Sequence, residues 1–320
     1  MRLAILLTMA LVASAQERAT EGELKLVLDT PVGLASEGPS WDPAGYLYFV
    51  GNNRLWRMDA KAKAEPYLDP SPGANGSLVD PQGRVDVCES QARRVIRIER
   101  DRSITVLADG FEGKKFNSPN DLAIDSKGRL YFTDPRYGRR DTIEMLDAAG
   151  KQLEGVYRID APGKVARIMT HEVDRPNGIL VSPGDRYLFV ADNNNNTEGG
   201  ARKLWRFDLK QDGTIDPTSR RLIFDWHKAR GPDGFKMDRE GRLYVAGGIN
   251  RATQFETIDE YKGGIFIISP EGKLIEFVAV PKDETTNCAF GGPDLKTLYI
   301  TSGGSLYSIR VKTAGLINAR

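Results

Sequence analysis

The feature of this sequence that most constrains its fold is a short phrase that occurs six times. Each copy begins at a turn that contains Gly or Asp and continues into an alternating strand with Leu-Tyr or a similar pair. The copies span residues 42–50, 80–87, 125–132, 182–190, 238–245 and 292–300. Consecutive copies begin 38 to 57 residues apart, which leaves room for one four-stranded antiparallel sheet per repeat. The repeat therefore predicts an all-β fold, a six-bladed β-propeller.

The two ends of the chain indicate how the ring of blades closes. The sixth repeat runs out of chain after the strand-like segment 305–311, one strand short of a full blade. The alternating segment 23–28 belongs to no repeat of its own. We therefore expect this N-terminal strand to join the last blade and remove its open edge. Residues 16–320 are expected to form a single domain.

Composition agrees with strands and turns and argues against several functions. The 33 Gly and 17 Pro among 320 residues are more than a helix bundle would tolerate. With 45 Lys and Arg against 44 Asp and Glu, the net charge of +1 favours neither nucleic acid nor an anionic membrane as a partner. Cys88 and Cys288 are the only cysteines, which excludes a disulfide framework and a multi-cysteine zinc site.

The first fifteen residues have the pattern of a signal peptide. Arg2 is followed by an apolar stretch at 3–12 that is too short to span a bilayer, and residues 13–15 read Ala-Ser-Ala. We expect cleavage after Ala15 and export of the mature protein, which would be periplasmic or secreted and not bound to a membrane. An uncleaved anchor or a buried N-terminal helix is the alternative. The mature protein is expected to be a monomer or a small homo-oligomer.

An oxygen-bearing side chain stands five residues before each repeated turn. The six positions hold Glu37, Asn75, Asn120, Asn177, Asp233 and Asn287. In a propeller, equivalent positions before each innermost strand converge on the central axis at one mouth of the ring. Taken singly, Asn-Gly and Asp-Gly are ordinary turn residues that tolerate left-handed backbone geometry. The propeller favours the other interpretation, in which these oxygens surround one point.

Such a ring calls for a cation. Glu37 and Asp233 would repel each other at the axis, and an all-oxygen donor set favours Ca²⁺ first and Mg²⁺ or Mn²⁺ next. Both histidines lie outside the ring, which argues against a dedicated zinc site, although Zn²⁺ could substitute in vitro. We expect one divalent cation, held by Glu37, Asp233, Asn177 and Asn120, with Asn75 and Asn287 as wall residues.

Five segments together carry a resemblance to a known family. They are Ser-Glu-Gly-Pro at 36–39, Asn-Ser-Pro-Asn-Asp at 117–121, Arg-Pro-Asn-Gly at 175–178, Gly-Pro-Asp-Gly at 231–234 and Thr-Asn-Cys-Ala-Phe-Gly-Gly at 286–292. In these segments the chain resembles the SMP-30/gluconolactonase/luciferin-regenerating-enzyme family of six-bladed propellers. The segment 133–138 is similar to the bacterial gluconolactonase branch.

The resemblance implies a metal-dependent hydrolase that opens sugar-type lactones. The residues that match the family's metal ligands are Glu37, Asn177 and Asp233, and Asn120 would contact the metal, water or substrate. The second strand of each blade returns to the same mouth and adds rim residues. With these, the expected substrate contacts are Asn75, Asn120, Asp134, Arg136, Tyr137 and Asn287.

The chemistry can be argued from the residue types. A metal at the tunnel mouth would polarise the lactone carbonyl and stabilise the developing oxyanion. The attacking water needs a base, and Asp233 and Asp121 are the candidates. A bound metal would lower the pKa of its ligand Asp233 and make that carboxylate a weak base, so Asp121 is the second candidate. The sequence contains no G-x-S-x-G motif and no ready Cys-His pair, so a covalent acyl-enzyme is not expected.

Two other functions fit the same pattern. A polarised P=O group would suit the same ion, so a calcium-dependent phosphotriesterase-like hydrolase is one alternative. The second is a non-enzymatic ligand-binding propeller whose calcium only closes the tunnel. Activity on lactones and phosphotriesters distinguishes the three functions.

Overall fold

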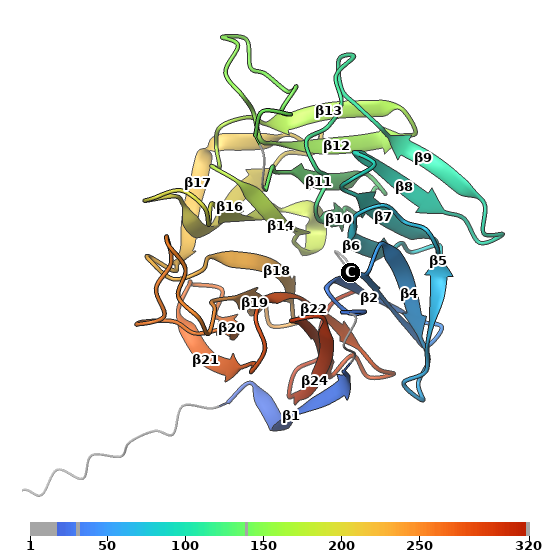
Figure 1. The fold of residues 1–320 in the computed structure, drawn as a ribbon, viewed down its shortest axis with the longest axis vertical. Coiled ribbons are helices and arrows are strands. Elements are labelled where there is room, and N and C mark those ends of the chain that lie inside the picture. Colours follow the sequence, from blue (N-terminus) through green and yellow to red (C-terminus); the bar gives the residue numbers. More distant parts are fainter. Residues whose placement is uncertain (1–17, 30–32, 138–139, 318–320) are drawn as a thin grey trace, which may run out of the picture.

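The computed structural model describes residues 18–29, 33–137 and 140–317. Six four-stranded antiparallel sheets surround a central axis like the blades of a propeller (Figure 1). The predicted six-bladed β-propeller is therefore confirmed. The predicted signal peptide, residues 1–15, lies outside the described residues. None of the helical structure within the described ranges is long and apolar enough to cross a membrane.

Within each blade, the strands are given in order from the innermost one, at the axis, to the outermost one. The first three blades consist of β2 (Glu37–Asp42), β3 (Tyr46–Gly51), β4 (Arg54–Met58) and β5 (Ala64–Leu68); β6 (Ala74–Val79), β7 (Val85–Glu89), β8 (Arg94–Ile98) and β9 (Ile104–Ala108); and β10 (Leu122–Ile124), β11 (Leu130–Asp134), β12 (Gly155–Ala161) and β13 (Lys164–Met169). The last three consist of β14 (Pro176–Val181), β15 (Tyr187–Asn193), β16 (Arg202–Leu209) and β17 (Ile215–Asp225); β18 (Pro232–Met237), β19 (Leu243–Gly247), β20 (Gly264–Ile268) and β21 (Leu274–Ala279); and β22 (Thr285–Gly291), β23 (Thr297–Ser302), β24 (Ser305–Val311) and β1 (Thr20–Leu28). A short 3₁₀ helix, η1 (Pro183–Asp185), joins β14 to β15.

The repeated phrase forms the hairpin between the first and second strands of each blade, and in three blades a buried aspartate explains it. Asp125 is 3% exposed, and its carboxylate accepts hydrogen bonds from the backbone N–H of Arg129 at 3.0 Å and from its Nε at 2.6 Å. Asp80 and Asp238 bind the arginine four residues later in the same way. A buried carboxylate needs such donors, so the Asp-x-x-Gly-Arg pattern recurs for a structural reason.

The hydrophobic core lies between the blades. Six clusters of buried apolar side chains exist in the described part of the chain, and each joins residues of two neighbouring blades. One cluster, for example, packs Tyr244 and Ile265 of the fifth blade against Phe290 and Ile300 of the sixth. All six blades are therefore covered on both faces, and this coverage requires a closed ring.

The ring closes as the sequence predicted. Strand β1 pairs antiparallel with β24 of the last blade, with Thr20 opposite Val311 and Leu28 opposite Leu306. The last blade thereby combines the N-terminal strand with the three C-terminal ones, and the two ends of the chain hold each other in place.

The C-terminal segment occupies one end of the central channel. The backbone N–H of Leu316 donates to the carbonyl of Met237 at 3.0 Å, and Leu316 lines a small apolar cavity together with Leu122 and Ile179. Met237 ends inner strand β18, whereas Asp233 lies near its start. The candidate site therefore lies at the mouth opposite the C-terminal segment.

We expect the Glu276→Gln substitution to loosen the ring closure. Glu276 of β21 accepts hydrogen bonds from the backbone N–H groups of Ala19 (2.6 Å) and Thr20 (3.0 Å), from the Thr20 hydroxyl (2.5 Å) and from Arg18 Nε (3.1 Å). Burial alone would raise the pKa of Glu276, but these hydrogen bonds outweigh it and lower the pKa. The variant should lose about 1–3 kcal/mol of unfolding free energy in urea at pH 7.

The pH dependence of that loss provides a control. Because the pKa of Glu276 is lower in the folded state, its stabilisation is complete at neutral pH and is lost as the pH falls through the folded-state pKa. The difference between wild type and variant should therefore shrink below about pH 4. An equal difference at pH 7 and at pH 3.5 would contradict an ionic contribution from Glu276.

Candidate active site

The six aligned side chains lie at the axial ends of the inner strands. Glu37, Asn75, Asn177, Asp233 and Asn287 fall within the first three residues of β2, β6, β14, β18 and β22, and Asn120 lies two residues before β10. Figure 1 shows these inner strands arranged around the axis. The structure thus brings to one mouth all six positions that the sequence aligned.

Contacts between neighbouring blades link the six positions into a closed circuit. A Cβ at Gly38 would lie 2.2 Å from the Asn75 carbonyl oxygen, and a Cβ at Gly178 would lie 2.2 Å from that of Asp233. Three further contacts have the same effect: Gly76 N–H donates to Asn120 O (2.6 Å), Thr133 Oγ1 to Asn177 O (2.6 Å), and a Cβ at Gly234 would overlap the Asn287 side chain. Asn287 Nδ2 closes the circuit by donating to Glu37 Oε2 at 3.0 Å.

The Asn-Gly and Asp-Gly pairs are not left-handed turns. Asn75, Asn177 and Asp233 are absent from the described non-glycine residues with positive φ, so these side chains sit on extended strands. In five blades the pairing register shifts at this point, so that the inner strand has one more residue than its partner. Such a bulge re-aims a side chain, here at the start of each inner strand.

Three carboxylates interact at this mouth. Burial, and then the charge of Asp121, raises the pKa of Glu37 to about 7. Burial raises the pKa of Asp233 well above its usual value, and the charge of Glu37 raises it further. Burial also raises the pKa of Asp121. Two charges were expected at the axis, and Asp121 adds a third. A cation between them would favour the ionised form of all three.

Lys236 is a residue of this site that the sequence analysis missed. It lies three residues after Asp233 on β18, half-buried beside the apolar channel, and its Nζ donates to the Phe235 carbonyl at 3.2 Å. Its charge lowers the pKa of both Glu37 and Asp121, against the effect of burial. A lysine between Phe235 and Met237, two apolar residues of an inner strand, was the signal that could have identified it.

Several oxygens at this mouth have no hydrogen-bond partner. Oδ1 of Asn75, Oδ2 of Asp121 and Oδ1 of Asn177 are buried and unpaired among the described residues. Buried polar atoms normally have a partner, so these oxygens suit a bound cation. No three His, Cys, Asp or Glu side chains in the described ranges are close enough to hold an ion by themselves. A metal here would therefore need amide oxygens as well as carboxylates.

The predicted wall residue Asn287 holds the carboxylate of Glu37 in place. Its amide donates to Glu37, and its Oδ1 accepts the backbone N–H of Cys288 at 2.9 Å. Both ends of the amide are therefore occupied, and Asn287 fixes the Glu37 carboxylate. Its expected contact with substrate has no support in this geometry.

Asp134 is fully buried, and the structure gives it a different role from the expected substrate contact. Its two carboxylate oxygens accept the backbone N–H groups of Asn117 and Ser118, both at 2.8 Å. Burial raises its pKa to about 7 despite these hydrogen bonds. Asp134 therefore anchors the segment that carries Asn120 and Asp121.

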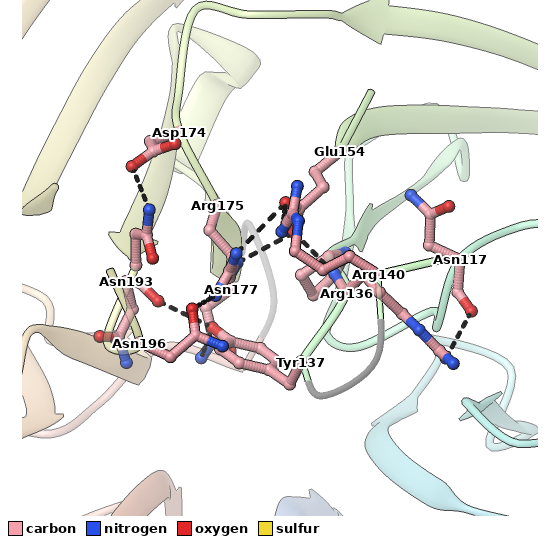
Figure 2. Close-up of polar contacts among 12 residues, drawn as sticks. Asn117, Arg136, Tyr137, Arg140, Glu154, Asp174, Arg175, Asn177, Asn193 and Asn196 are labelled. Atoms are coloured by element: carbon pink, nitrogen blue, oxygen red, sulfur yellow. Dashed lines mark hydrogen bonds and ion pairs between the residues drawn. The ribbon is translucent and has the colours of Figure 1, made fainter. Parts of the chain in front are cut away.

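Arg136 and Tyr137 lie half-buried at the rim, in the connection between β11 and β12. The Arg136 backbone N–H donates to Glu154 at 2.7 Å, and its guanidinium reaches the Asn117 carbonyl at 3.5 Å. The Tyr137 hydroxyl contacts Asn177 at 3.0 Å. Figure 2 shows these residues grouped beside the start of β14. The structure thus places Tyr137 next to a predicted metal ligand, Asn177, whereas Arg136 contacts Glu154 and Asn117.

Comparisons with known proteins give a family match and relatives of similar sequence and fold. Residues 35–304 match the family described as SMP-30/Gluconolactonase/LRE-like region. The chain is 32% identical to a gluconolactonase of Zymomonas mobilis over 88% of this chain and 79% of that protein, and 31% identical to regucalcin of Xenopus laevis over 83% and 82%. The solved structure of a gluconolactonase from Xanthomonas campestris superposes with a TM-score of 0.71 at 26% identity, covering 90% of this chain and 89% of the other.

We expect Gly178→Ala to damage the circuit of inner strands. The added Cβ would meet the backbone of Asp233 and Gly234, which cannot move without shifting the fifth blade. The unfolding free energy in urea should fall by about 3 kcal/mol. Gly163→Ala is the control, because Gly163 has a φ of +75° but open space around it, and this variant should lose only about 1 kcal/mol. Equal losses would show that close approach at the axis is unimportant.

Proposed function

Because the chain belongs to the SMP-30/gluconolactonase/LRE-like family, we propose that it is a metal-dependent lactonase, a carboxylic-ester hydrolase that opens sugar-type lactones. The relative from Zymomonas mobilis, which aligns along most of both chains, bears the name gluconolactonase and supports this substrate class. The observation that carries the proposal is the convergence of carboxylate and unpaired amide oxygens at one mouth of the channel.

One divalent cation would be held by Glu37, Asn177 and Asp233, with Asn120 close to the metal or the substrate. The all-oxygen donor set favours Ca²⁺, then Mg²⁺ or Mn²⁺, with Zn²⁺ as an in vitro substitute. When bound, such an ion supplies a Lewis acid that polarises the lactone carbonyl and stabilises the charge on its oxygen.

The base belongs to the same group of carboxylates. Asp121 has one oxygen held by the backbone N–H of Leu122 at 2.9 Å and the other buried and unpaired. The unpaired oxygen can accept the proton of an attacking water, while the paired one keeps the carboxylate in place. Asp233, in contrast, would coordinate the metal, which would lower its pKa and make it the weaker base.

The other nucleophile candidates in the described chain are poorly placed. Cys88 and Cys288 are fully buried, and burial raises the pKa of both thiols, that of Cys288 to about 12. His171 and His227 are exposed and pair with Asp147 and Glu260. Water is therefore the nucleophile in this proposal, and an acyl-enzyme is not part of it.

The proposal extends to the remaining expectations from the sequence. Residues 1–15 would direct export and be removed, leaving one propeller domain in the periplasm or outside the cell. N-terminal sequencing of the exported protein tests the cleavage after Ala15.

A substrate panel separates this function from its alternatives. Hydrolysis of δ-gluconolactone, simple γ-lactones and a phosphotriester would be measured on the metal-loaded protein. The proposal predicts the highest kcat/KM on a sugar lactone. A preference for the phosphotriester would indicate the other hydrolase, and inactivity on all three would favour a binding propeller.

We expect Asp233→Asn to abolish both metal binding and hydrolysis while the fold survives, because the variant removes one of the charges that hold the cation. Calorimetric titration with Ca²⁺ and lactone turnover would be measured on the same sample. Chelated wild-type protein should lose activity and regain it when Ca²⁺ is returned. Full activity after exhaustive chelation would rule out the Lewis-acid role.

We expect Asp121→Asn to separate the base from the metal ligands. If Asp121 takes the proton from water, kcat should fall by about 10²–10⁴-fold at saturating metal. The Ca²⁺ dissociation constant should rise by less than about tenfold, since only a nearby charge is lost. Unchanged kcat would transfer the role of base to Asp233.

A further inference from the structure

The side-chain amide of Asn177 is held from one side only. Its Nδ2 donates to the hydroxyl oxygen of Tyr137 at 3.0 Å, and its Oδ1 is buried without a partner among the described residues. Asn177 belongs to β14 of the fourth blade, whereas Tyr137 follows β11 of the third. One blade thus contacts the candidate metal ligand of the next (Figure 2).

The hydrogen bonds of Tyr137 determine which way the amide points. The hydroxyl has one proton, and this proton goes to the backbone carbonyl of Asn193 at 3.2 Å. Its lone pair then faces Asn177, which must present its NH₂ group. If the amide were flipped, the hydroxyl could make only one of the two hydrogen bonds. The orientation that satisfies both directs Oδ1 away from Tyr137.

Tyr137 is itself fixed by a buried arginine. The guanidinium of Arg175 lies 5.4 Å from the centre of the Tyr137 ring, a distance suited to a cation–π contact. Arg175 is 2% exposed, and its Nε donates to Glu154 at 3.0 Å. Its Nη1 donates to Asn196 Oδ1 at 2.5 Å. Figure 2 shows this network from Glu154 through Arg175 to Tyr137.

Glu154 also ties the backbone next to Tyr137. It accepts the backbone N–H of Arg136 at 2.7 Å and pairs with Arg140, and its side chain is 4% exposed. The ring of Tyr137 is therefore held by Arg175 above it and by the backbone before it, and both are held by one carboxylate. These contacts hold the ring of Tyr137 in one position.

We propose that Tyr137 is a positioning residue, which acts through Asn177 by aiming the amide oxygen at the cation. The inference rests on the proposed function, in which Asn177 is a metal ligand. It assigns Tyr137 a role different from the expected substrate contact, because the proton of its hydroxyl and the lone pair facing Asn177 are both in use. Partners that orient a metal ligand typically change metal affinity 10–100-fold when they are removed.

The test is Tyr137→Phe in the full chain, which keeps the ring over Arg175 and removes only the hydroxyl. Calorimetric titration of the metal-stripped protein with Ca²⁺ should give a dissociation constant about 10–100-fold higher than that of wild type. At saturating Ca²⁺ the KM for lactone should stay within about twofold of wild type. An unchanged dissociation constant together with a raised KM would overturn the inference and return Tyr137 to substrate binding.

Tyr131→Phe is the matched control. Tyr131 lies in the same blade, is fully buried, and donates its hydroxyl to Asp125 at 3.0 Å, near the opposite mouth. This variant should have wild-type Ca²⁺ affinity and activity, with at most a lower melting temperature. If the control weakens Ca²⁺ binding as much as Tyr137→Phe, the effect is structural and the inference is wrong.

Two further outcomes remain distinguishable. If Tyr137→Phe does not fold, Arg175→Lys provides the same measurement, since it removes the planar group over the ring, and its Ca²⁺ affinity should fall at unchanged KM. Wild-type affinity in that variant would overturn the inference. If wild-type protein binds no divalent cation, the proposed function itself fails, and the role of Tyr137 fails with it.

Discussion

Inner strands of neighbouring blades approach so closely that the carbonyl oxygen of one strand lies where the next would carry a Cβ. Gly38 and Gly178 permit this approach, and hydrogen bonds or a side-chain contact complete the circuit in the other blades. In five of the six blades, a bulge at the same point gives the inner strand one more residue than its partner and turns a polar side chain toward the axis. The candidate site follows from this packing, because six strand starts can meet only where glycine or a bulge makes room.

The chemistry of the site is local, although the chain as a whole is nearly neutral. A net charge of +1 over 320 residues says nothing of the three carboxylates at one mouth. Burial raises the pKa of each, and their mutual repulsion adds to it for Glu37 and Asp233. Lys236 reduces this cost only in part. A buried group of negative charges is stable at neutral pH only when protons or a cation compensate it, and an enzyme can use the cation.

Some side chains contribute oxygens to the site, and others hold those oxygens in position. One group of side chains supplies oxygens to the axis, and another fixes those oxygens from the neighbouring blade. Asn287 holds Glu37, Asp134 holds the segment before β10, and Tyr137 holds Asn177. Each supporting residue acts across a blade boundary or on a connecting segment. Much of the polar network at the rim therefore serves the geometry of the site.

The sequence alone determined the number of blades, the closing strand and the six positions at the axis, because these depend on a local pattern that repeats along the chain. It did not reveal the bulges, since an extra residue is visible only against the partner strand. It also assigned Asp134 and Asn287 to substrate, because a polar residue at a rim looks the same whether its oxygens are free or occupied. The partner of Tyr137 was hidden for a related reason, because its hydrogen bond joins residues 40 positions apart. The effect of Lys236 was equally hidden, because its charge acts on Glu37 and Asp121, which belong to other blades. The repeat in the sequence determined which oxygens converge at the axis. The direction in which a side chain such as Asn177 points depends on contacts between blades, which exist only in the closed ring.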